Sequence, residues 1–134
     1  MTETKRFTYF TIDSESKPGQ FLAIARKFQQ ANVGLLATWA FESRPGTGQC
    51  CVVAQDPTPL RKLLQTSGWK FTEGTCFRVT GDDRTGALIE TLEPLAKEGI
   101  NLQVVDGIAV GGKYAAFLLG DARETDRIGK ALKA

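Results

Sequence analysis

Two short glycine-bearing loops contain the residue types that could bind an anion. They are SKPG, from Ser16 to Gly19, and DRTG, from Asp83 to Gly86, and each comes directly before an apolar pattern of helical spacing. The first N–H groups of a helix have no partner within the helix, and the helix dipole favours a negative charge there. Such a loop could hold the carboxylate of an amino acid or of another carboxylic acid. Either loop alone would more simply be a strand-to-helix turn, but its occurrence twice strengthens the binding interpretation.

The sequence around the second loop fits two other kinds of site poorly. Gly81 and Gly86 have the spacing of the glycines in a phosphate-binding P-loop, but the residues after the second glycine are Ala87 and Leu88 instead of lysine and serine or threonine. The adjacent pair Asp82-Asp83 has diverging side chains, and no histidine or third carboxylate joins it in sequence. We interpret this pair as part of a solvated loop with a helix cap, in preference to a metal or acid–base site.

The absence of histidine limits the catalytic chemistry available to the chain. It excludes the hydrolases that need an imidazole base and most catalytic zinc sites. The three cysteines, Cys50, Cys51 and Cys76, are odd in number and form no disulfide framework, so they indicate the reducing cytoplasm. No nucleophile–base pair or metal cluster is visible. We therefore predict a protein that is not an enzyme, with no catalytic residue, no metal site and no cofactor.

The composition indicates a soluble protein without a nucleic-acid or membrane partner. The 134 residues include 17 basic and 15 acidic ones spread along the chain, and a net charge of +2 is too small to favour either partner. No apolar run approaches the roughly 20 residues of a membrane span, and residues 1–13 lack the apolar core of a signal peptide. An RNA-recognition motif is disfavoured, because Tyr114 and Phe117 would lie on opposite faces of their strand.

The elements that must position the two loops occur in the same order twice. A shift of 67 positions places Gly19 on Gly86 and the apolar residues of one helical pattern on those of the other. The first half is predicted as a strand (5–13), a helix opened by Pro18 and ending before Gly34, two strands (35–41 and 50–55), a short helix (56–68) and a possible strand (69–72). The second half is predicted as a strand (75–80), a helix (85–98) with Gly99 as its C-terminal cap, two strands (102–110 and 113–119) joined by a tight Gly111-Gly112 turn, and a short helix (121–134).

This order predicts an α+β fold of two ferredoxin-like βαββαβ modules, each an antiparallel sheet with helices on one face. We place the first module at residues 1–72 and the second at residues 73–134. The second module has no residues left for its last strand, so that edge is open or filled by another segment, such as the long N-terminal strand. Strands 50–54 and 113–119 carry apolar residues on both faces, which predicts a covering sheet or subunit and hence an oligomer.

The two loops and the segments that follow the helices resemble those of ACT domains, the small-molecule regulatory modules of amino-acid metabolism. The family pattern is a strand, a loop ending in D-x-P-G or D-R-P-G, an apolar helix, and G-I-N-I opening the next strand. Asp83 to Gly86 and the sequence GINL from Gly99 to Leu102 match it closely, with Thr85 in place of the proline. Lys17 to Gly19 and NVGL from Asn32 to Leu35 match more loosely, with Ser16 where the acidic residue would stand.

The resemblance covers the whole chain and implies a stand-alone tandem ACT protein. In that family an amino acid binds at the interface between two modules and meets the first loop of one module and strand residues of its neighbour. The ligand carboxylate is then expected on the backbone of either loop, and its ammonium group on Asp83, Asn101 or Asp106. The candidate ligand-binding residues are Ser16, Lys17, Pro18, Gly19, Asp83, Arg84, Thr85, Gly86, Asn101 and Asp106.

The expected function is therefore regulatory and non-catalytic. The expected partners are an amino acid, further copies of the chain and a regulated enzyme, with neither nucleic acid nor membrane among them. The alternative is a structural or protein-interaction ACT pair that binds no ligand.

Overall fold

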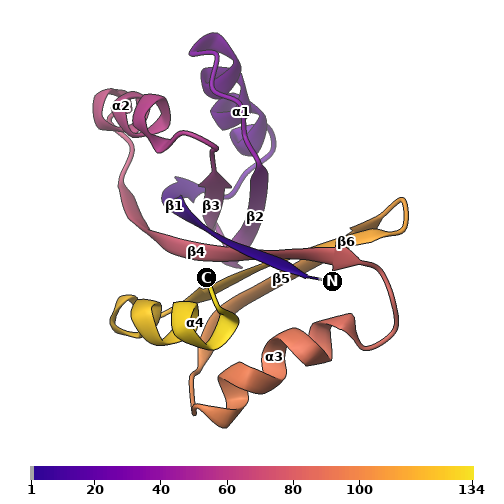
Figure 1. Ribbon diagram of the computed structural model, residues 1–134. Helices are drawn as coiled ribbons and strands as arrows, with labels where there is room; N and C mark the ends of the chain where they lie inside the picture. The colour runs from indigo at the N-terminus through magenta and orange to yellow at the C-terminus, as the bar shows by residue number, and fades with distance from the viewer. Residues whose placement is uncertain (1) are drawn as a thin grey trace. The chain divides into compact units, whose positions relative to one another are not determined.

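The computed structural model describes residues 2–134 as an α+β fold whose paired strands run antiparallel. Its elements, labelled in Figure 1, are β1 (Glu3–Glu15), α1 (Gln20–Gln30), β2 (Ala37–Arg44), β3 (Thr47–Val53), α2 (Pro57–Ser67), β4 (Phe71–Asp82), α3 (Ala87–Lys97), β5 (Leu102–Val110), β6 (Lys113–Gly120), the short 3₁₀ turn η1 (Ala122–Glu124) and α4 (Thr125–Leu132). The chain divides into two compact units. The first is Thr8–Gly74, and the second is Thr75–Ala134 together with the N-terminal segment that ends at Phe7.

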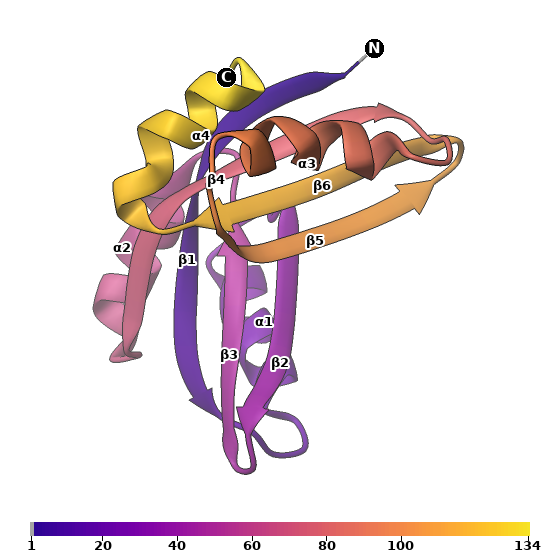
Figure 2. The same cartoon turned by 90° about the horizontal axis from the view of Figure 1, so that it is seen from below.

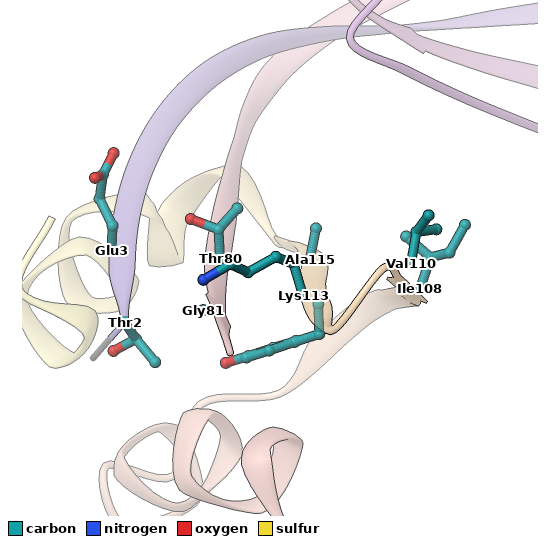
Figure 3. A pocket seen from close by; sticks show the side chains of 9 residues that line it. Thr2, Glu3, Thr80, Gly81, Ile108, Val110, Lys113 and Ala115 are labelled. Carbon is teal, nitrogen blue, oxygen red and sulfur yellow. The ribbon is translucent and has the colours of Figure 1, made fainter. Parts of the chain in front are cut away.

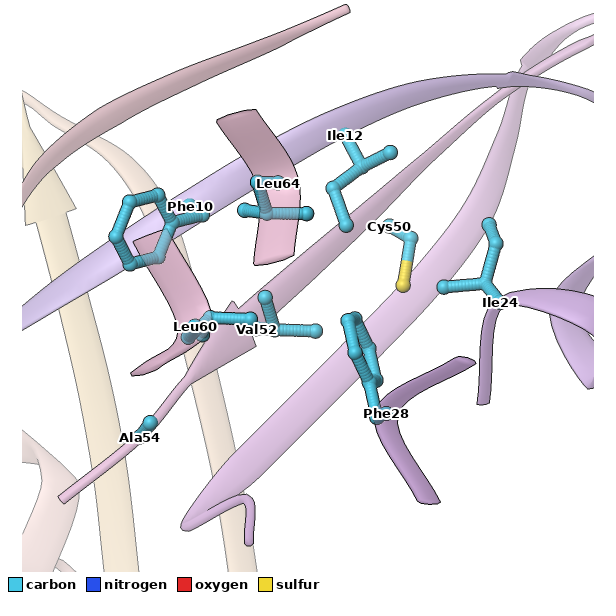
Figure 4. Packing of buried hydrophobic residues seen from close by; sticks show 9 residues of the cluster. All are labelled: Phe10, Ile12, Ile24, Phe28, Cys50, Val52, Ala54, Leu60 and Leu64. Carbon is cyan, nitrogen blue, oxygen red and sulfur yellow. The ribbon is translucent and has the colours of Figure 1, made fainter. Parts of the chain in front are cut away.

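The first unit is a sheet in the order β2-β3-β1, with α1 and α2 packed on one face. Its core is a cluster of buried side chains from both helices and from two strands, seen from close by in Figure 4. The start of β4 continues this sheet beside β1, since the amide of Asp13 donates to the carbonyl oxygen of Lys70 (3.0 Å). The cluster consists of Phe10, Ile12, Ile24, Phe28, Cys50, Val52, Ala54, Leu60 and Leu64.

The second unit is a sheet in the order β4-β6-β5, with α3 and α4 on one face, as Figure 2 shows. The N-terminal part of β1 lies next to β4 and completes this sheet on the side away from β5. Arg6 ties this segment to the unit, because its guanidinium lies 5.2 Å from the centre of the Phe77 ring and donates to the carbonyl oxygen of Ala134 (3.2 Å). The N-terminal segment thus supplies the strand that lies beside β4 in this unit.

One strand differs from the prediction made from the sequence. The sequence suggested separate strands on either side of Glu73-Gly74, whereas β4 runs without a break from Phe71 to Asp82. The glycine lies inside the strand because the ring of Tyr9 rests against it, and a Cβ atom at Gly74 would stand 2.9 Å from Cε1 of Tyr9. Here glycine allows close approach of a side chain, a role that a sequence pattern does not distinguish from a turn.

Both faces of the central strands are occupied by buried side chains. On β3 the core residues Cys50 and Val52 alternate with Cys51 and Val53, and all four are buried. On β6 the residues of both faces are buried as well. The oligomer that the sequence suggests stays a prediction.

The backbones of α1 and α3 repeat each other at a shift of 67 positions. Each helix has 11 residues and is preceded by a left-handed glycine, Gly19 (φ +83°) and Gly86 (φ +89°). The closing hydrogen bonds recur as well: the amide of Val33 donates to the carbonyl of Phe28 (2.9 Å), and that of Ile100 to the carbonyl of Leu95 (3.0 Å). The two helices therefore begin and end by the same backbone geometry, although few of their side chains agree.

Substitutions on α1 will separate core packing from helix propensity. Ile24 is 2% exposed and belongs to the core cluster, whereas Leu22 on the same helix is 54% exposed. Ile24→Ala is expected to lower the free energy of unfolding by about 2–5 kcal/mol, and Leu22→Ala by less than about 0.5 kcal/mol. Urea unfolding followed by circular dichroism measures both values, and equal losses would contradict the packing described for this unit.

The three cysteine thiols are buried and are expected to be unreactive in the folded protein. Burial raises the pKa of Cys50 and of Cys51, and it raises the pKa of the Cys76 thiol to about 12. Because the thiolate is the reactive form, iodoacetamide at pH 8 should leave all three unmodified in buffer and alkylate all three in urea. Mass spectrometry counts the adducts, and rapid labelling of Cys76 in the folded state would show that β4 opens locally.

Candidate functional site

An open cavity of about 460 Å³ lies in the second unit beside the loop that joins β4 to α3. Its walls come from that loop, from the first turn of α3 and from the facing strands β5 and β6. The lining residues are Asp83, Arg84, Gly86, Ala87, Leu88, Ile89, Val105, Gly107, Ile108, Ala109, Tyr114 and Ala116.

The loop is held by backbone hydrogen bonds that leave amides at the start of α3 unpaired. The amide of Asp83 donates to the carbonyl oxygen of Gly112 (2.9 Å), and that of Ala87 to the carbonyl oxygen of Arg84 (3.1 Å). No side chain caps the helix. Among the described residues, the amides of Leu88 and Ile89 have no hydrogen-bond partner. These two N–H groups lie at the positive end of the helix dipole and beside the cavity, where they favour an anionic group.

The charged side chains at the cavity are exposed and partly paired. The guanidinium of Arg84 forms an ion pair with Glu90 one turn into the helix. Just before the loop, Asp82 accepts a hydrogen bond from the ammonium group of Lys113, which lowers the pKa of the Asp82 carboxyl. Asp83 is the one carboxylate among the lining residues, and it is exposed.

Tyr114 closes the bottom of the cavity and is anchored in the core. It is 8% exposed, and its hydroxyl lies 3.2 Å from the Oγ1 atom of Thr91. The Thr91 hydroxyl also lies 3.4 Å from the carbonyl oxygen of Ala87, to which it can donate. This chain of bonds holds the ring beneath the first turn of α3, and the rest of the cavity wall is formed by the apolar or small residues Val105, Gly107 and Ala109.

The structure brings together part of the predicted set. Asp83, Arg84 and Gly86 all line the cavity, and Thr85 lies in the same loop without lining it. Asn101 lies at the other end of α3 and is exposed. Its side chain is therefore not part of this cavity.

Asp106 is also exposed and lies on the other face of the sheet. It pairs with Phe117 of β6, whereas the cavity residue Gly107 pairs with Ala116 and so faces α3. Sequence reasoning did not identify the wall residues of β5 or Tyr114. The available signal was the series of small and apolar residues on β5, which does not by itself show which residues face the loop.

The first predicted loop, Ser16 to Gly19, has the same backbone hydrogen bonds as the second loop but different neighbouring side chains. The amide of Ser16 donates to the carbonyl oxygen of Gly46 (3.1 Å), and that of Gln20 to the carbonyl oxygen of Lys17 (3.2 Å), as in the second loop. The ammonium group of Lys17 pairs with Glu15 at 2.8 Å, and this hydrogen bond raises the pKa of Lys17. Pro18 and Gly19 complete the turn and are exposed.

A second cavity, of about 550 Å³, is lined by residues that include members of β1, β4, β5 and β6, and it contains none of the predicted site residues. Figure 3 shows its side chains, with Lys113 extending toward Thr80. Its charged groups already have partners, since Lys113 pairs with Asp82 and Glu3 pairs with Lys5 (3.2 Å). It has no helix start in its wall, so it lacks the unpaired amides of the first cavity.

Over residues 2–134, no three histidine, cysteine, aspartate or glutamate side chains gather closely enough to hold a metal ion. No helix in the same range is both long and apolar enough to span a bilayer.

Solved structures with a similar fold include protein BT0572 and regulatory subunits of aspartate kinase. Protein BT0572 from Bacteroides thetaiotaomicron superposes with a TM-score of 0.85 at 18% identity, over 97% of this chain and 88% of that one. The ligand-free regulatory subunit of aspartate kinase from Thermus thermophilus superposes with a TM-score of 0.67 at 11% identity, over 98% and 94%. The fold is ACT-like.

A third structure places the same fold within a larger enzyme. Aspartokinase III from E. coli, in complex with aspartate and ADP, superposes with a TM-score of 0.58 at 13% identity, over 98% of this chain and 32% of that one. No family model matches the sequence, and no curated protein is significantly similar to it. At these identities the likeness shows the fold alone.

The two left-handed glycines are expected to be equally important for the backbone. A Cβ atom at Gly19 or Gly86 would meet no atom within 4 Å, so the cost of alanine there is the strain of a positive φ. Gly19→Ala and Gly86→Ala should each lower the free energy of unfolding by about 1 kcal/mol. Gly34→Ala is the control, because Gly34 also has free space and no positive φ, and its change should be neutral or stabilising. Urea unfolding measures the three free energies of unfolding. An equal loss in all three variants would show that alanine itself, and not the strain of a positive φ, is the cause.

Proposed function

We propose that this chain is a non-catalytic regulatory protein of the ACT type, and that the cavity beside the β4–α3 loop binds an amino acid. One observation carries the proposal: the loop that the sequence singled out for anion binding lines a cavity, with Asp83, Arg84 and Gly86 in its wall. A helix start with unpaired amides and a carboxylate next to it match the two charged groups that every free amino acid has.

In the proposed complex the ligand carboxylate accepts hydrogen bonds from the amides of Leu88 and Ile89. The ammonium group binds the exposed carboxylate of Asp83. The side chain of the ligand then points toward β5, where Val105 and Ala109 present apolar surface. Because the wall contains no charged residue beyond the loop, an amino acid with an apolar side chain should be preferred over an acidic or basic one.

Binding at this loop is proposed to regulate a partner by changing how modules or subunits pack. The solved structures support this direction, since two of them are regulatory subunits of aspartate kinase. One larger enzyme with this fold was crystallised with aspartate. The partners proposed for this chain are accordingly an amino acid, a second copy of the chain and a regulated enzyme. A ligand acts in this way only if it binds one arrangement more tightly than the other.

Thermal melting with each of the twenty amino acids tests the proposal. A ligand at 100 times its dissociation constant adds about 2.7 kcal/mol of stability, which raises the melting temperature by several degrees. We expect the largest increase from leucine, isoleucine or valine. No increase from any amino acid would reject the proposal and favour the alternative of a structural or protein-interaction pair.

A substitution within the cavity wall provides the matched control. Gly107→Leu directs a side chain into the cavity, and the structure has room for it, because a Cβ atom there would lie 3.9 Å from its nearest neighbour, the carbonyl oxygen of Ala115. Ala40→Leu introduces the same side chain at the corresponding position of the first unit, 67 residues earlier. The first variant should lose the response to amino acids and the second should keep it. Retention by Gly107→Leu would place the binding site elsewhere.

A further inference from the structure

The two units differ most at the place that forms the cavity in the second one. The strand pairing shows which residues correspond. Tyr114 pairs with Gly81 and Ala109, and Gly48 pairs with Ser14 and Glu42, which are the residues 67 positions before Gly81 and Ala109. Gly48 therefore stands where the second unit has its cavity floor. On the helices, the shift of 67 positions that relates Gly19 to Gly86 places Phe21 on the cavity residue Leu88.

The ring of Phe21 covers the backbone at this place. Its Cζ atom lies 3.4 Å from the position of a Cβ atom on Gly48, so the ring tip rests where a side chain of β3 would otherwise stand. Phe21 is still 37% exposed, which is high for a phenylalanine that serves only as core. It is also outside the buried core cluster of the first unit. The ring thus spans from the helix surface down to the sheet.

A buried polar atom lies under the same ring. The Oγ atom of Ser14 is 3.5 Å from the same Cβ position on Gly48 and is buried, and among the described residues it has no hydrogen-bond partner. An unpaired buried hydroxyl costs free energy unless water or a ligand can reach it. The apolar ring thus covers a group that would bind a polar partner if the ring were absent.

In the second unit the aromatic ring between helix and sheet comes from the sheet instead of the helix. Its ring, that of Tyr114, belongs to the sheet and is held below α3 by Thr91, whose counterpart in the first unit is the apolar Ile24. The helix residue above it is the shorter Leu88, and the space over the ring is open. The Tyr114 ring, which is held on the sheet, leaves a cavity above it. The Phe21 ring, which comes from α1, occupies the corresponding space in the first unit.

We propose that the first unit contains a second amino-acid site that the side chain of Phe21 closes, so that the intact chain has one open site and one closed site. This inference rests on the proposed function for the chemistry of the ligand. The loop before α1 has the same backbone hydrogen bonds as the loop before α3, and the amides of Phe21 and Leu22 correspond to those of Leu88 and Ile89. The ring of Phe21 takes the place of a ligand's apolar side chain, and its removal also uncovers the hydroxyl of Ser14.

Nuclear magnetic resonance of the full chain tests the inference, with L-leucine, L-isoleucine and L-valine as separate probes. In the wild type, backbone amide shifts should change only in the loop Asp83–Ile89 and the facing part of β5. In Phe21→Ala, a second set of changes should appear at Ser14, at Ser16–Leu22 and at Gly48, and the number of bound probes should rise from one to two per chain.

Leu22→Ala is the control: it removes an apolar side chain from the same turn but leaves the ring over Gly48, and its binding should match the wild type. Phe21→Leu, which introduces the residue type of the second unit, replaces Phe21→Ala if that variant does not fold.

The reverse exchange should close the open site. Leu88→Phe places a ring at the start of α3, and the amino acids should then cause no shift changes at Asp83–Ile89. Wild-type changes at both loops would overturn the inference, because they would show that Phe21 does not exclude ligand.

Benzene distinguishes a failure of this inference from a failure of the proposed function. As an apolar ring without charged groups, it should shift the amides of Ser14 and Gly48 in Phe21→Ala and not in the wild type, whether or not any amino acid binds. If benzene gives these shifts while no amino acid shifts Asp83–Ile89 in the wild type, the closing role of Phe21 is supported and the proposed function is rejected. If a folded Phe21→Ala shows no new shift with either benzene or the three amino acids, the inference is overturned.

Discussion

The positive φ of the glycine before α1 and of the glycine before α3 is the constraint on which the rest of the structure depends. A strand that leaves the sheet must turn back over it within a few residues, and Gly19 and Gly86 provide this reversal with a backbone conformation that other residues adopt only at a cost. Because the helix then starts at once, no capping side chain stands before it, and its first amides remain unpaired. The same geometric solution that closes the core thus also creates a surface that favours an anion.

The two units share the same backbone geometry at the helix start but fill the space beside it with different side chains. In the first unit the space between helix start and sheet is filled by a phenylalanine on the helix, and the sheet has glycine below it. In the second unit the aromatic residue belongs to the sheet, and its hydroxyl is bound by a threonine of α3. Both arrangements preserve the packing of a helix on a sheet. In the second unit a cavity lies beside the loop, whereas in the first unit the ring of Phe21 rests over Gly48.

The organisation of the strands shows how the fold depends on contacts between distant parts of the chain. In the sheet of the second unit, the N-terminal part of β1 lies beside β4. Residues before Thr8 and after Gly74 therefore share one core environment, with Arg6 against Phe77. A boundary drawn along the sequence divides residues that pack together, because strands that pair in a sheet need not be neighbours in the chain.

The sequence by itself determined the local structure and the loop of interest. Helical spacing, the glycines and the tight turn at Gly111-Gly112 indicated the elements, and the residues Asp83, Arg84 and Gly86 were selected before their surroundings were known. These features are local, because they depend on backbone preferences and periodicity within a few residues. Only the tertiary structure decided the rest: that Gly74 lies within a strand against Tyr9, that Asp106 lies on the face away from the cavity, and that Phe21 and Tyr114 fill matching spaces from opposite sides. Each of these depends on the register between strands and on contacts between residues far apart in the chain, and neither composition nor spacing specifies which side chain will occupy a shared volume.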